Sequence, residues 1–92
     1  MGNKINNIKT EISNTLELPK EIMLDLPKVI LIGNIQLNIE NHKGIIEYSP
    51  NKIRVSTKSG MIKILGKDLY IKTIIKEEII ITGEINTFEY IL

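Results

Sequence analysis

The chain has 92 residues, of which 42% are hydrophobic and 4% aromatic, and its 12 basic and 11 acidic residues leave a net charge of +1. So small a charge excludes a strong field that would draw the protein to nucleic acid or anionic lipid. The absence of cysteine excludes a disulfide scaffold, a Cys-ligated zinc site and a thiol nucleophile, and fits a reducing cytoplasm. A chain of this length predicts a single domain over residues 1–92.

The N-terminal residues have the pattern of an amphipathic helix. Ile5, Ile8, Ile12 and Leu16 recur at spacings of three, four and four, which places them on one face of a helix over residues 1–16. So short a helix is marginal alone, so we expect it to pack on its own sheet or on a partner. Residues 17–28 contain two of the three prolines and are predicted to form a linker.

Beyond residue 28 the hydrophobic pattern changes to a period of two. The chain contains 21 Ile and no Ala, and β-branched side chains favour strands. Apolar residues recur at every second position in five segments, as expected of half-buried strands: Ile35–Ile39, Ile53–Val55, Ile62–Ile64, Leu69–Ile71 and Ile79–Ile81. The sequence therefore predicts a mainly all-β fold, with about seven or eight short strands over residues 29–92.

Four turn-forming residues suggest an internal repeat. Gly33, Pro50, Gly66 and Gly83 follow one another at spacings of 17, 16 and 17. This period is typical of an antiparallel β-meander or sandwich built from hairpins, and it also suits a short β-solenoid. The short segment Lys58–Gly60 between two apolar strands favours the antiparallel arrangement.

Few residues could carry chemistry. His42, the single histidine, stands in the turn-like segment 41–44 and is predicted to be a surface turn residue. No nucleophile motif, paired acid and base, or glycine-rich phosphate loop is present, so we expect no catalytic residue, cofactor or metal. Glu40 with His42 comes closest to ligand spacing, which leaves a small-ligand or metal-binding β domain as an alternative function. The scattered aromatic residues and interspersed acidic ones argue against nucleic-acid binding.

Some isoleucines fall on the side of the strands opposite the predicted core. Ile30, Ile74 and Ile80 are of this kind, so the sheet is predicted to be apolar on both faces, as in a sandwich layer or a sheet that meets a partner. Together with Ile5, Ile8 and Ile12, these residues are candidate contacts for a partner. The apolar runs are far shorter than the ~20 residues that span a bilayer, so no spanning segment is predicted.

The order of several segments resembles the YabP/YqfC family of endospore-forming bacteria. The resemblance covers about residues 16–92 and is carried by Leu16–Lys28, Leu31–Ile35, Ile39–Ile45, Gly60–Lys72 and Glu78–Ile85. The turn formed by Glu40, Asn41, His42, Lys43 and Gly44 is the most specific piece. Lys43 stands where we expect Arg in the family, which keeps the charge but not the planar fork of donors.

The resemblance implies a non-enzymatic sporulation protein made in the mother cell. It would be a structural or adaptor module of spore-envelope formation, cytoplasmic and peripheral at the forespore membrane, working with a membrane protein of the YqfD type. The family supplies no catalytic residues to carry over. The segment 40–44 is then a candidate interaction site, and exposed strand edges leave a homo-oligomer as a further expectation.

Overall fold

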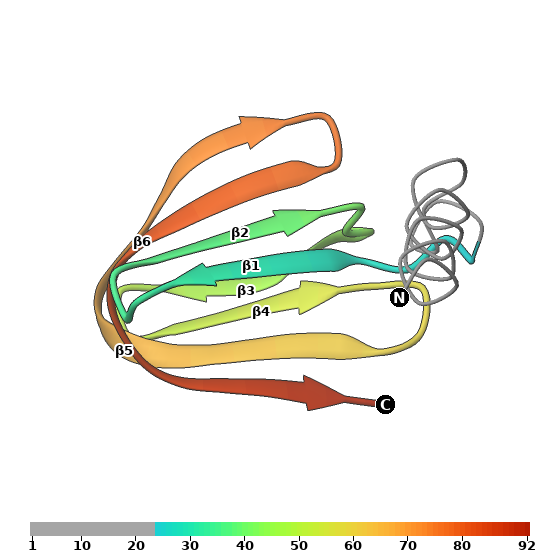
Figure 1. Ribbon diagram of the computed structural model, residues 1–92. Helices are drawn as coiled ribbons and strands as arrows, with labels where there is room; N and C mark the ends of the chain where they lie inside the picture. The colour runs from blue at the N-terminus through green and yellow to red at the C-terminus, as the bar shows by residue number, and fades with distance from the viewer. Residues whose placement is uncertain (1–23) are drawn as a thin grey trace, which may run out of the picture.

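The computed structural model describes residues 24–92, which form one six-stranded antiparallel sheet (Figure 1). The strands are β1 (Lys28–Ile32), β2 (Gln36–Glu40), β3 (Gly44–Ser49), β4 (Lys52–Ser56), β5 (Met61–Ile75) and β6 (Glu78–Ile91). The predicted all-β class is confirmed, and no helix in this part of the chain could cross a membrane. The predicted helix over residues 1–16, with Ile5, Ile8 and Ile12, lies outside the described residues, as does most of the predicted linker.

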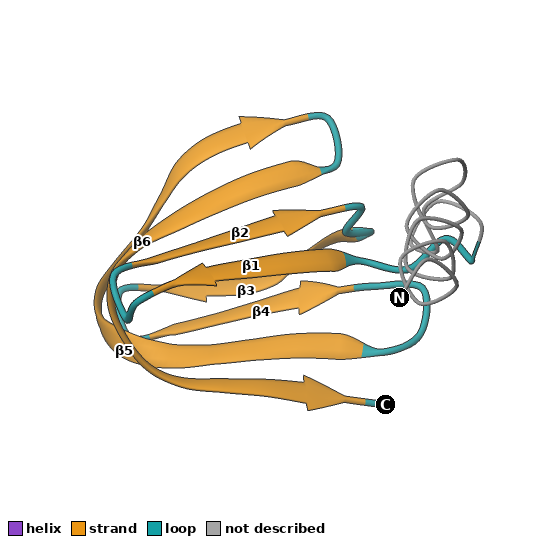
Figure 2. Ribbon diagram, viewed as in Figure 1, coloured by secondary structure: helices purple, strands orange, loops and turns teal. Residues whose placement is uncertain are grey.

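The sheet folds over on itself because its two longest strands bend in the middle (Figure 2). Layer A consists of β1, β2, residues 78–82 of β6 and residues 70–75 of β5. Layer B consists of β3, β4, residues 61–66 of β5 and residues 85–91 of β6. The bends need glycine: a Cβ on Gly66 would overlap the carbonyl group of Glu84, and Gly83 has a φ of 133°.

The core lies between the two layers. Layer A contributes Leu37, Ile39, Ile79 and Ile81, layer B contributes Ile53, Val55, Ile62 and Ile64, and Leu69 and Ile85 complete the core near the bends. The alternation in the sequence predicted most of these positions. Ile35 is an exception: it lies in the β1–β2 turn and is 62% exposed, since the paired strand starts only at Gln36.

The 17-residue spacing has a structural explanation. Gly33 and Pro50 lie in the β1–β2 and β3–β4 turns, whereas Gly66 and Gly83 lie at the bends of β5 and β6. Each bend pairs with one turn, since the Ile85 N–H donates to the Asn34 carbonyl and the Leu69 N–H to the Pro50 carbonyl, both at 2.7 Å. The two layers are therefore built alike, each from one hairpin and one half of each long strand.

This arrangement favours the predicted sandwich over the solenoid, because every strand pair is antiparallel. It is not a simple meander. The strand order is β1-β2-β6-β5-β4-β3, so β2 pairs with the last strand, and the chain crosses from layer A to layer B after Glu40. The expected seven or eight short strands are six, because residues 66–68 form a bend within one 15-residue strand and not a turn between two.

Candidate functional site

Residues 41–43, the middle of the segment 40–44 predicted as an interaction site, form the connection between the two layers. The His42 N–H donates to the Glu77 carbonyl in the β5–β6 turn at 3.1 Å, and the Lys43 N–H donates to the Ser56 carbonyl of β4 at 2.7 Å. Asn41 has a φ of 64°, which turns the chain out of β2. The connection thus holds the ends of the two layers together.

The ring of His42 is buried, and the prediction of a surface turn residue is wrong. Only 8% of the residue is exposed. Its Nδ1 accepts a hydrogen bond from the Gly44 N–H at 3.0 Å, so the proton of the neutral ring is assigned to Nε2. Nε2 is buried without a hydrogen-bond partner. A surface turn was expected because Asn-His-Lys-Gly is polar, but the backbone of this segment is hydrogen-bonded between Glu77 and Ser56.

Burial lowers the pKa of His42 below its ordinary value of 6.5. The negative charge of Glu77 opposes this shift, and the positive charge of Lys43 adds to it. Protonation would also place a proton on Nδ1, where the Gly44 N–H now donates. The neutral ring is therefore the form that fits the fold.

The same connection fixes the chain just before β1 through a polar cluster. Asn41 Nδ2 donates to Asp25 Oδ1 at 2.9 Å and to the Leu26 carbonyl at 3.1 Å, and Lys43 Nζ lies 3.2 Å from Asp25 Oδ1. The hydrogen bond from Asn41 and then that from Lys43 hold the pKa of Asp25 below its usual value. Sequence reasoning missed Asp25, because it lies 16 residues before Asn41 in a segment interpreted as a linker.

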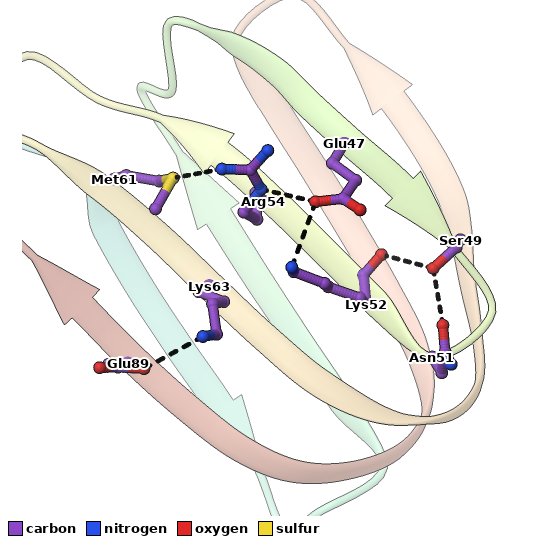
Figure 3. A network of polar contacts seen from close by, with 8 residues as sticks. All are labelled: Glu47, Ser49, Asn51, Lys52, Arg54, Met61, Lys63 and Glu89. Carbon is purple, nitrogen blue, oxygen red and sulfur yellow. Dashed lines mark hydrogen bonds and ion pairs between the residues drawn. The ribbon is translucent and has the colours of Figure 1, made fainter.

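A row of charged side chains crosses the outer face of layer B (Figure 3). In register, Glu47 lies opposite Arg54, Arg54 opposite Lys63, and Lys63 opposite Glu89. Arg54 Nε donates to Glu47 Oε1 at 2.6 Å, and Lys63 Nζ lies 3.8 Å from Glu89 Oε1. The hydrogen bond from Arg54 is the first cause that lowers the pKa of Glu47. Alternating charges on β4 could have revealed this row, which sequence reasoning did not identify.

The equivalent row of layer A is apolar and amide-bearing. Ile30 lies opposite Asn38, Asn38 opposite Ile80, and Ile80 opposite Thr73. Ile30 and Ile80 are thus on the outer face, as the sequence predicted. Ile74 is not: the extra residue at Lys72 shifts the register, so Ile74 lies opposite the buried Ile79, on the inward side of an edge strand.

Glu40 and Gly44 flank the connection at the ends of β2 and β3, with Glu40 opposite Lys28 in register. The structure brings Asn41 and Lys43 together at Asp25, whereas Ile30 and Ile80 lie on the outer face of layer A. Within residues 24–92, no three His, Asp or Glu side chains are grouped so that they could hold a metal ion.

Comparison with known proteins gives a clear relationship. Residues 25–91 match the sequence profile of the YabP family. The chain belongs to the YabP family. A Bacillus subtilis protein named YqfC, described as uncharacterized, is 37% identical over 91 residues, which are 99% of this chain and 98% of the relative. No solved structure matches.

The family match begins at Asp25 and ends at Ile91, and so contains the whole folded sandwich of this YabP-family protein. It includes the connection 41–43 and the aspartate that the connection holds. The resemblance identified in the sequence is thereby confirmed, including its likeness to YqfC.

Proposed function

We propose that this protein is a non-enzymatic adaptor of spore-envelope formation that acts with a membrane-protein partner. Membership of the YabP family fits a sporulation-associated protein and is the observation that carries the proposal. The adaptor acts in the mother-cell cytoplasm, peripheral at the forespore membrane. Its partner is a membrane protein of the YqfD type.

The connection at residues 41–43 supports a structural role for the most specific part of the sequence. Several polar atoms that would attract a substrate or metal already contact other residues of the chain: His42 Nδ1 accepts from the Gly44 N–H, and Asn41 and Lys43 contact Asp25. The buried ring of His42 offers no accessible base. We therefore propose that this segment holds the two layers together and fixes the chain just before β1.

The outer face of layer A supports docking of a partner. An apolar surface exposed to water is favourable to cover, whereas the paired charges on layer B are well solvated where they are. Ile30 and Ile32 are exposed on this face, and Ile80 lies beside Asn38 at its centre. The face could seat a domain of the membrane partner. The predicted helix face of Ile5, Ile8 and Ile12 is a second candidate contact.

The first experiment deletes the coding sequence in the spore-forming host and counts heat-resistant spores. We expect a large loss, restored by the intact protein; a normal spore count in the deletion strain would contradict the proposal. A fluorescent fusion should gather at the forespore membrane only when the membrane partner is present. The same location in cells without that partner would contradict the partner assignment.

A matched pair of variants tests the docking face. Ile80→Lys places a charge on the outer face of layer A, whereas Ile46→Lys places the same charge on β3 of layer B. We expect Ile80→Lys alone to lose membrane location while both variants retain the far-ultraviolet circular dichroism of the sheet. Equal location of the two variants would rule out docking through this face.

A further inference from the structure

The sandwich leaves four strand edges unpaired among residues 24–92. They are β1 and residues 70–75 of β5 in layer A, and β3 and residues 85–91 of β6 in layer B. An unpaired edge presents N–H and C=O groups that can pair with another chain, and stable proteins usually blunt such edges. The four edges differ in how far they are blunted.

Three of the edges contain an irregularity that interrupts pairing. An extra residue disturbs the register at Ile46 in β3, at Lys72 in β5 and at Asn86 in β6. Such bulges twist an edge away from a regular partner, and the bulge of β5 also carries a charge. In addition, the Ile71 N–H on β5 donates to the Tyr48 hydroxyl at 3.1 Å.

The β1 edge has none of these features. Its five residues pair with β2 in unbroken register, and Val29, Ile30, Leu31 and Ile32 follow its only charge, Lys28. Leu31 is 51% exposed although it lies opposite the fully buried Leu37. On the inward side of β1, Val29 packs against the core, whereas Leu31 is left uncovered by the described part of the chain, residues 24–92. The strand is thus regular, apolar on both faces and open.

We propose that two copies of this chain pair through their β1 strands, antiparallel and centred on Ile30. Pairing of an edge with itself closes around a two-fold axis, so it ends at a dimer. Pairing of β1 with one of the other edges would continue from copy to copy, and their bulges oppose it. Layer A of each copy would then join into one continuous eight-stranded layer.

The charges of β1 favour this register. A two-fold axis through Ile30 keeps all five residue pairs and sets Val29 opposite Leu31 of the second copy. Each Lys28 then lies opposite Ile32 of the second copy, so the two ammonium groups never face each other. Leu31 becomes covered on the inward side, and Ile30 meets its own copy on the outer face. This pairing does not depend on the proposed role in spore formation.

Cross-linking tests the register, and the chain's lack of cysteine makes it specific. Opposed residues in antiparallel strands have Cα atoms about 4.5–5.5 Å apart, within the reach of a disulfide. In Ile30→Cys the two thiols should meet and form a covalent dimer on mild oxidation. In Ile32→Cys they would be about 13 Å apart along the strands and should not. Absence of the Ile30→Cys dimer, or equal cross-linking of both variants, would overturn the register.

Sedimentation equilibrium of the full chain tests the dimer itself. We expect a mass of about twice 10.5 kDa, reduced to the monomer by Ile30→Lys and unchanged by the matched Ile46→Lys. A monomer at all concentrations would overturn the proposal and point to cover from the chain's own N-terminal residues. Species larger than a dimer, or a dimer that survives Ile30→Lys, would overturn it as well.

Discussion

The two layers of the sandwich have the same construction, but their outer faces differ in chemical character. Across layer B the row reads Glu47, Arg54, Lys63 and Glu89, and across layer A the equivalent row reads Ile30, Asn38, Ile80 and Thr73. Inside, both layers present fully buried Ile or Leu side chains. The two layers thus share their inner pattern, while one outer face is charged and the other is largely apolar.

The largest effect is expected from truncating the shared core. Ile64 of layer B and Ile81 of layer A are both fully buried at equivalent positions. Ile64→Ala and Ile81→Ala should each lower the free energy of unfolding by about 2–5 kcal/mol, because each loses buried area and leaves a cavity. Urea unfolding followed by circular dichroism measures both. A large cost in one layer and almost none in the other would show that the layers are not equivalent inside.

A smaller, pH-dependent effect is expected where His42 joins the layers. The folded state lowers the pKa of His42 from its ordinary value of 6.5. At a pH below 6.5 the unfolded chain therefore binds a proton on His42 more readily than the folded protein does. The stability that the neutral ring contributes is thus fully present above pH 6.5, and it is lost as the pH falls through the folded-state pKa of His42. Because His42 is the single histidine, its NMR titration is unambiguous.

His42→Gln gives the control for that effect. It should remove this part of the pH dependence between neutral and mildly acidic conditions while leaving the carboxylate-dependent part at lower pH. If the urea midpoint of the unchanged protein were flat from pH 7 to the acid transition of its carboxyl groups, the burial of a neutral ring would be contradicted.

The smallest effect is expected from the charged row of layer B. Glu47→Gln should slightly lower the urea midpoint, since the folded state holds the pKa of Glu47 below its ordinary value. The difference from the unchanged protein should be present above that ordinary value, disappear as the pH falls through the folded-state pKa, and shrink at high salt. Asn38→Ala on the equivalent row of layer A should show no salt dependence. Equal salt dependence of the two variants would remove the electrostatic contrast between the faces.

Much of the inner structure could be predicted from the sequence, because alternation reports directly which residues face a core. Leu37, Ile53, Ile64 and Ile81 were found in this way. The number and order of the strands could not be predicted in this way. A glycine followed by polar residues looks the same in the sequence whether it forms a tight turn between two strands or a bend within one strand. The sequence pattern predicts a turn at residues 66–68, which divides one long strand into two.

The candidate site shows the same limit. The segment 40–44 was identified as distinctive, but its role depends on Asp25 and Glu77, which are distant in the sequence. Period alone also misplaced Ile74, because one extra residue at Lys72 reverses the faces that follow it. Local patterns therefore located the residues, and only the register of the strands could assign their surroundings.

The position of β6 has a consequence for how the chain reaches its fold. This last strand lies between β2 and β5, so the sheet cannot be completed until residues 78–91 have been synthesised. Until then the edge of β2 that pairs with β6 has no neighbouring strand, and the apolar residues of the β1–β2 hairpin stay exposed. Pairing segments some 40 residues apart is slow compared with closing a hairpin. The final step of assembly thus waits until β6 has been synthesised, because this strand joins two otherwise separate parts of the sheet.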